Sequence, residues 1–118
     1  MKMKMKIEFS QIVRRKMKAL KRSLSDRFDS NTADKALRSI MQAAKGLSDF
    51  PEKGEAVSSL FDVDTDFRVL YVNHNYLFYY VEDKKIIVAE MFDEREDFMY
   101  KLFGISSESE ESLDYWNE

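Results

Sequence analysis

Three short segments rich in β-branched and aromatic residues follow one another within residues 67–92, and they constrain the fold more than any other feature of the chain. Phe67–Val72 and Tyr76–Val81 are separated by the polar residues 73–75, and the polar residues 82–85 lead into Ile86–Phe92. Connections this short join antiparallel neighbours, because a parallel pair needs a crossover of a dozen or more residues. The sequence therefore predicts a three-stranded antiparallel meander, which needs a cover for its apolar face.

Two amphipathic helices upstream supply that cover. The first is expected over Gln11–Phe28 with Ser10 as its N-cap, because apolar residues recur there at helical spacing. The second, capped by Asn31 or Thr32, has small and apolar residues on its buried side and ends before Pro51. The first stripe comprises Val13, Met17, Leu20, Leu24 and Phe28, and the second comprises Ala33, Ala36, Leu37, Ile40, Ala44 and Leu47. The short turn between the helices predicts an antiparallel αα-hairpin.

The remaining segments complete the order β-α-α-β-β-β-α. Residues 3–9 alternate apolar and charged side chains, which is typical of a strand with one buried face. Residues 56–61 are expected to be a short extended segment, and Asp97–Phe103 a closing helix that stops at Gly104. The predicted class is α+β: an antiparallel sheet covered on one face by a two-helix hairpin. We expect one domain over residues 1–105, followed by an acidic tail at 106–118.

Composition narrows the functional classes. The chain has no Cys, which excludes disulfides and thiolate chemistry, and a single His, which excludes a multi-histidine metal site. The N-terminus alternates Met and Lys without the continuous apolar run of a secretory signal, so a cytoplasmic protein is expected, with no membrane association. Charge is asymmetric: residues 1–45 carry 13 Lys and Arg against 4 acidic residues, although the whole chain has net charge −3. The basic half could face an anionic partner, or it could form ordinary solvated helices.

The order of these elements, together with four short passages, resembles the RelE/ParE superfamily of bacterial toxins over about residues 3–104. The passage Leu47–Gly54 is similar to the family's "L…FP…G" connection between helix and sheet. Arg68 matches an Arg on the second strand, and Tyr76–Val81 matches the "Y-x-x-x-Y" strand that follows. Ile86–Phe92 and then Asp93–Asp97 are similar to the strand and "R-x-D" motif that close the ParE-like sheet.

This resemblance implies a toxin of a type II toxin–antitoxin (plasmid stabilisation, or addiction) module, whose partner is a cognate antitoxin. ParE-like members inhibit growth through DNA gyrase and are not known as enzymes, whereas RelE-like members are endoribonucleases that cut mRNA on the ribosome. The ParE-like function, directed at gyrase or a similar protein, is the leading hypothesis, since a sequence pI near 5.3 is unusual for a protein that binds nucleic acid. A RelE-like endoribonuclease and a non-toxic binding module on the same fold are the alternatives.

If the chain is RelE-like, the resemblance implies catalysis by Arg68, Arg95, Tyr100 and Lys53. RNA cleavage needs a base, an acid and cations around the phosphate. Two features weaken that assignment: Tyr100 is displaced by one residue from the family's spacing, and the lysine that should pair with Lys53 is missing. Carboxylates at 94, 96 and 97 are also expected to neutralise Arg95.

Three further features are considered for function. His74, between two asparagines, is interpreted as an exposed turn residue, with a general-base role as the alternative. No bound metal or small-molecule cofactor is expected, because neither a metal-ligand motif nor a phosphate-binding glycine loop occurs in the sequence. Leu113, Tyr115 and Trp116 in the acidic tail are expected to contact either the domain or a partner.

Overall fold

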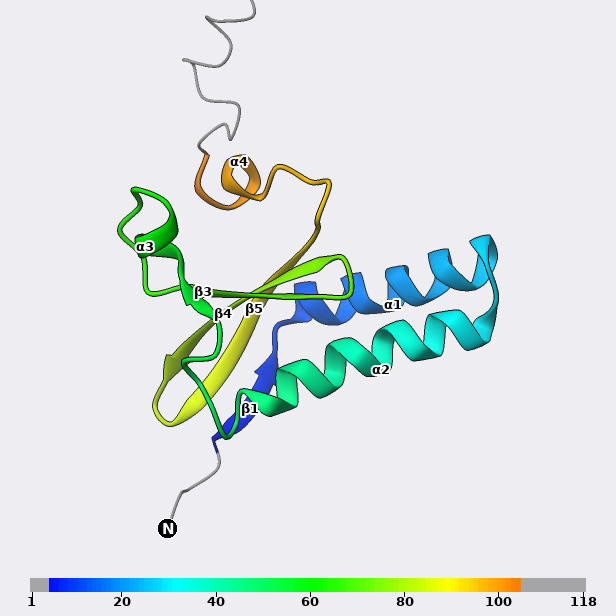
Figure 1. Ribbon diagram of the computed structural model, residues 1–118, viewed down its shortest axis with the longest axis horizontal. Helices are drawn as coiled ribbons and strands as arrows, with labels where there is room; N and C mark the ends of the chain where they lie inside the picture. Colours follow the sequence, from blue (N-terminus) through cyan, green and yellow to red (C-terminus); the bar gives the residue numbers. More distant parts are fainter. Residues whose placement is uncertain (1–4, 105–118) are drawn as a thin grey trace, which may run out of the picture.

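A computed structural model describes residues 5–104 of the chain. The elements in chain order are β1 (Lys6–Phe9), α1 (Gln11–Arg27), α2 (Ser30–Gly46), β2 (Glu55–Ala56), α3 (Val57–Leu60), β3 (Arg68–Val72), β4 (Asn75–Glu82), β5 (Lys85–Asp93) and α4 (Phe98–Phe103). The five strands form one sheet in the order β1-β5-β4-β3-β2. Figure 1 shows α1 and α2 as a long hairpin that extends beyond the sheet, with α3 and α4 at the other end of the molecule.

The predicted meander is confirmed, since β3, β4 and β5 pair antiparallel in sequence order. Two-residue turns join these strands, and both central residues of each turn have positive φ: 49° and 64° at Asn73 and His74, and 49° and 61° at Asp83 and Lys84. Such turns match the right-handed twist of the paired strands, and Asn and Asp tolerate this conformation better than most residues. Each strand of the β4–β5 hairpin therefore extends closer to its turn than the β-rich segments predict.

The predicted α+β class is confirmed, with a sheet that is mostly antiparallel; one edge strand pairs in parallel, which the sequence did not predict. β1 lies at one edge and pairs in parallel with β5, Ile7 facing Ile86 and Phe9 facing Val88. The alternating pattern of residues 3–9 indicates which face of a strand is buried, but it does not indicate the strand's partner or direction. The long passage through α1, α2 and the intervening strands makes the parallel pairing possible, because it provides the necessary crossover.

The helical hairpin forms largely as predicted, with one corrected cap. The hydroxyl of Ser10 accepts a hydrogen bond from the Val13 N–H at 3.1 Å, as expected for the N-cap of α1. The second helix is capped by Asp29 instead of Asn31 or Thr32, because the Asp29 carboxylate accepts the Thr32 N–H at 2.6 Å. The short Asp side chain at the N-cap accepts a hydrogen bond from a backbone N–H that would otherwise lack a partner, and its negative charge interacts favourably with the positive end of the helix dipole.

Residues 56–61 are extended only at their start, which corrects the expected extended segment. Ala56 belongs to the two-residue β2, and Val57 then begins the single-turn helix α3. The turn closes through a 2.9 Å hydrogen bond from the Phe61 N–H to the Val57 carbonyl. Burial of Val57 against the sheet drives this conformation, an effect of tertiary packing that local sequence does not encode.

Both faces of the sheet carry apolar clusters. Toward the hairpin the buried residues are Val13, Ile40, Ala44, Leu47, Leu77, Tyr79, Ile86, Val88 and Met91. On the opposite face Val57, Phe78 and Phe92 pack with the partly buried Phe61, Phe67, Val69, Tyr76, Phe98, Leu102 and Phe103. Neighbouring residues of β4 point to opposite faces, so Phe78 lies on the face away from the hairpin. Phe98 and Leu102 of α4 pack with Phe78, and α4 therefore lies on that face. Gly104 ends α4 in the left-handed conformation, with φ of 72°, as predicted for a helix stop.

One sequence-based expectation about α1 has a different outcome. Phe28, the last residue of the predicted stripe on α1, is 62% exposed because the hairpin extends past the sheet. The predicted tail at 106–118 lies outside the described residues. Within residues 5–104, no helix is long and apolar enough to cross a membrane.

Candidate functional site

The loop from Pro51 to Gly54 is anchored by the buried side chain of Tyr79. Its hydroxyl donates to the Pro51 carbonyl at 2.7 Å and accepts the Gly54 N–H at 2.9 Å. Burial raises the pKa of the Tyr79 phenol, although the contact with Gly54 acts in the opposite direction. A Cβ at Gly54 would lie 2.6 Å from the Tyr79 hydroxyl and 2.8 Å from the Val69 carbonyl, so this position requires glycine. The "FP…G" passage is thus fixed to the centre of the sheet.

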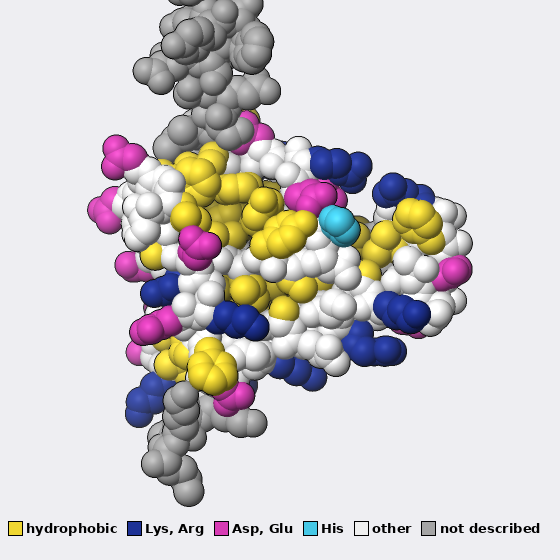
Figure 2. All heavy atoms as spheres, in the orientation of Figure 1, with side chains coloured by type: hydrophobic (Ala, Val, Ile, Leu, Met, Phe, Trp, Pro, Cys, Tyr) yellow, Lys and Arg dark blue, Asp and Glu magenta, His cyan; other side chains and the backbone are white. Residues whose placement is uncertain are grey.

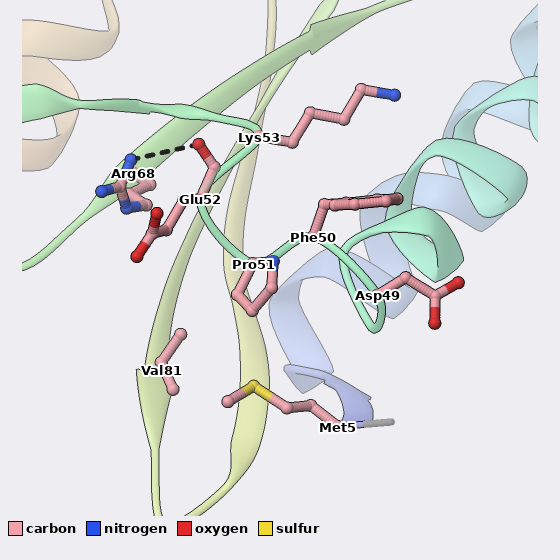
Figure 3. A pocket seen from close by; sticks show the side chains of 8 residues that line it. All are labelled: Met5, Asp49, Phe50, Pro51, Glu52, Lys53, Arg68 and Val81. Carbon is pink, nitrogen blue, oxygen red and sulfur yellow. Dashed lines mark hydrogen bonds between the residues drawn. The ribbon is translucent and has the colours of Figure 1, made fainter. Parts of the chain in front are cut away.

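Arg68, the second-strand arginine, supports the same loop from the start of β3. Its guanidinium donates to the Gly54 carbonyl at 2.6 Å and, more weakly, to the Glu52 carbonyl at 3.5 Å. Figure 3 shows the Arg68 side chain directed at the Glu52 backbone. The Arg68 side chain is partly buried, and its hydrogen bonds to the two carbonyls stabilise the loop.

A groove runs beside this loop and contains two of the predicted site residues. It is lined by Met5, Asp49, Phe50, Pro51, Glu52, Lys53, Arg68 and Val81. In Figure 3 the Lys53 side chain points away from the Arg68 guanidinium. The two cations therefore share one groove without converging on a common point in the described conformation.

Arg95 lies in a separate cleft and is paired with a carboxylate. Its Nε is 2.8 Å from the Asp93 carboxylate, and the Arg95 side chain is 75% exposed. The side-chain hydrogen bonding between Arg95 and Asp93 lowers the pKa of Asp93 and raises the pKa of Arg95. The predicted neutralisation of Arg95 comes chiefly from Asp93, whereas Glu96 forms its own ion pair with Lys101 at 2.7 Å.

The same cleft contains a polar cluster that the sequence did not predict. It lies between the far end of the hairpin and the β3–β4 turn, and Leu20, Leu24 and Phe28 line its helical side. The Tyr71 hydroxyl donates to Glu94, whose other oxygen is 3.1 Å from His74 Nδ1. The bond from Tyr71 is the main cause of the lowered pKa of Glu94, and it raises the pKa of Tyr71. In Figure 2 the histidine lies on the surface beside acidic side chains, as expected for a turn residue.

Tyr100, the fourth predicted site residue, lies on α4 and is 61% exposed. Lys53 and Arg68 thus line one groove, Arg95 lines another cleft, and Tyr100 belongs to the short helix on the opposite face from the hairpin. Within the described part of the chain, no group of three His, Asp or Glu residues is placed to hold a metal ion.

Lys16 makes a second contact that sequence inspection missed. It extends from α1 to the sheet, where its ammonium is 2.7 Å from a Glu90 carboxylate oxygen and donates to the Met91 carbonyl at 2.9 Å. The same nitrogen lies 4.1 Å from the centre of the Phe92 ring. A lysine outside the apolar stripe gives no sequence signal for such a role, since solvated helix faces carry many lysines.

A solved structure has a similar fold. It is described as the chromosomal ParDE toxin–antitoxin system from P. aeruginosa, and it matches with a TM-score of 0.65 over 75% of this chain and 95% of that one. Sequence identity is 16%, so this likeness establishes a common fold.

The sequence itself assigns the family. Residues 7–98 match the model of the ParE toxin of the type II toxin–antitoxin system parDE. The chain therefore belongs to the ParE toxin family and is the toxin component of a type II toxin–antitoxin system. A comparison with curated protein sequences finds no match.

Proposed function

We propose that this toxin inhibits DNA gyrase, or a similar cytoplasmic protein target, by binding to it rather than by cleaving RNA. The observation that carries the proposal is the separation of the four residues that RNA cleavage would use. A nuclease site must bring a base, an acid and cations around one phosphate. Here two of the candidates line one groove, one is paired with a carboxylate in another cleft, and one lies on α4.

The contacts of the arginines add support. Arg68 is bound to two backbone carbonyls, and Arg95 is paired with Asp93, so both guanidinium groups already use part of their hydrogen-bonding capacity within the protein. The Asp93 carboxylate also offsets the charge of Arg95, which weakens the attraction of this arginine for a phosphate. A surface that binds a folded protein needs no such convergence of reactive groups.

The antitoxin is the second partner that we propose. The P. aeruginosa structure is described as a ParDE system, and the family is that of a toxin encoded with an antitoxin. Half-exposed apolar side chains such as Ile12, Phe50 and Tyr71 are available as anchors for such a partner. Binding of the antitoxin would neutralise the toxin by covering the surface that contacts the target.

The first test measures incorporation of labelled thymidine and labelled amino acid within minutes of inducing the toxin without its antitoxin in a bacterial host. The proposal predicts a prompt fall in thymidine incorporation, before amino-acid incorporation changes. A prompt fall in amino-acid incorporation would instead favour the ribosome-dependent endoribonuclease. If neither changes, the chain acts as a non-toxic binding module, and the proposal is wrong.

Variants sharpen this test. Arg68→Ala is a poor choice, because loss of the loop contact and loss of catalysis would both reduce toxicity. Lys53→Ala, Arg95→Ala and Tyr100→Phe change exposed side chains, so the fold should persist. We expect all three to remain toxic, with Lys84→Ala in the β4–β5 turn as the matched surface control. Loss of toxicity in the three variants but not in the control, at equal protein levels, would indicate catalysis.

A further inference from the structure

A shallow groove runs between the two helices of the hairpin. It is lined by Arg14, Met17, Lys18 and Lys21 of α1 and by Leu37 and Met41 of α2, with no residue from a strand. The groove therefore opens on the side of the hairpin that does not face the sheet. Its floor is apolar and adaptable, because methionine side chains are flexible and make favourable contacts with aromatic rings.

The rim of this groove is basic. Arg14, Lys18 and Lys21 recur at intervals of four and three residues, which places them along one face of α1. All three are exposed, and the only ion pair among them within residues 5–104 is a long one, 3.7 Å, from Lys21 to Asp34. Residues 11–46 as a whole carry ten Lys and Arg against three Asp, and Figure 2 shows basic side chains gathered around the hairpin.

The C-terminal segment of the same chain has the complementary chemistry. Residues 105–118 contain five carboxylates and no basic side chain, and three large apolar residues stand among the last of those carboxylates. The carboxylates are Glu108, Glu110, Glu111, Asp114 and Glu118, and the apolar residues are Leu113, Tyr115 and Trp116. We propose that residues 105–118 bind the groove between α1 and α2, with their aromatic residues on its methionine-lined floor and their carboxylates along its basic rim.

The length of this segment determines which of its residues can take part. An extended chain spans about 3.3 Å per residue, so the nine steps from Gly104 to Leu113 can cover about 30 Å. In Figure 1, α4 and the hairpin lie apart within the plane of the view, across the two longer extents of the molecule, 55 and 40 Å. The proposed contact therefore uses the end of the segment, residues 113–118, because these residues are the farthest along the chain from Gly104.

The aromatic face beside α4 is nearer but electrostatically unsuitable. Glu94 lies at its edge, and the exposed Asp62, Asp64 and Asp66 lie in the connection between α3 and β3. Figure 2 shows acidic side chains over α3 on this face. Like charges would repel the segment there, whereas the hairpin attracts it.

Trp116 is the only tryptophan of the chain, so its fluorescence reports on this contact in the full-length protein without a label. We expect the indole to be shielded from acrylamide at low salt and to become accessible at high salt, because salt screens exposed ion pairs. Shielding should not depend on protein concentration, since the contact is within one molecule.

The variant pair Lys18→Glu with Lys21→Glu should reduce the ratio of bound to free segment about tenfold, a size typical of two exposed ion pairs replaced by repulsion. The matched control is Lys53→Glu with Lys84→Glu, which makes the same charge change outside the groove and should leave quenching unchanged. If the reversed pair fails to fold by circular dichroism, Lys18→Ala with Lys21→Ala serves instead, with a smaller effect.

Three results would overturn the proposal. Trp116 could be as accessible as free indole in the unmodified protein at low salt. It could be shielded but insensitive to the groove variants, which would place the segment elsewhere. It could be shielded only at high protein concentration, which would make the contact one between two copies. None of these results bears on the gyrase proposal, which thymidine incorporation tests separately.

Discussion

The Tyr79 hydroxyl is the most informative single group to remove. Tyr79→Phe keeps the buried ring but deletes the donor to the Pro51 carbonyl and the acceptor for the Gly54 N–H. Tyr79 is fully buried, and Gly54 is also buried, so its N–H is left without a partner. An unsatisfied buried polar group costs about 1–3 kcal/mol, while the partly exposed Pro51 carbonyl can bind water. We therefore expect the free energy of unfolding to fall by about 2 kcal/mol.

Urea denaturation measures this change, and an unaltered slope would show that the unfolded state is the same. Tyr80→Phe is the matched control: Tyr80 is the next residue on β4, and within the described residues its hydroxyl makes no hydrogen bond, so we expect a change below about 0.5 kcal/mol. A Tyr79→Phe variant as stable as the Tyr80→Phe variant would refute the assignment of Tyr79 as the anchor of the loop.

The pKa of Tyr79 gives the same prediction a dependence on pH. Burial raises the pKa of this phenol above its ordinary value of 10.0, so the unfolded chain releases the proton first as pH rises. The stability is fully present below pH 10.0 and is lost as pH rises from there through the raised pKa. Tyr79→Phe should therefore lose less stability in alkali than the unmodified protein. An equal alkaline loss in both would show that Tyr79 is not the group responsible.

Three further substitutions test individual contacts. Gly54→Ala should lower the free energy of unfolding by about 2 kcal/mol, because the new methyl group would overlap the buried tyrosine hydroxyl; thermal melting unchanged from the parent would contradict the close approach. Arg95→Ala should raise the pKa of Asp93 toward its ordinary 3.8, as followed by NMR titration, and a pKa that stays low would mean that another group stabilises the carboxylate. Lys16→Ala should cost about 1 kcal/mol by leaving the partly buried Glu90 carboxylate without its ion pair, and urea denaturation without any change would show this ion pair to be inert.

Much of the fold could be predicted because its signals are local. The β-rich segments between residues 67 and 92 are joined by turns that leave only an antiparallel arrangement, and the stripes on α1 and α2 are periodic. The parallel pairing of β1 was not predictable, since strand direction depends on the path of the whole chain. The helical turn at Val57 was missed for a similar reason, because its burial depends on Phe78 and Phe92, far along the sequence.

The functional residues were harder to predict. The resemblance identified Arg68, but the sequence did not show that its guanidinium supports the loop ending at Gly54. The contact between Tyr71 and Glu94 joins residues 23 positions apart and arises only when β3 and the end of β5 are brought together. The motif residues were thus found by their type, whereas the contacts that define what they do are properties of the folded chain.

The central claim is that this toxin inhibits a protein target by binding. The most direct measurement adds purified full-length toxin to DNA gyrase and relaxed plasmid and follows supercoiling, with translating ribosomes and mRNA in a parallel reaction. Our account predicts that supercoiling stops when toxin and gyrase are present at comparable concentrations, while the mRNA stays intact. Supercoiling that continues at excess toxin, together with repeated cleavage of ribosome-bound mRNA by a small amount of toxin, would contradict it.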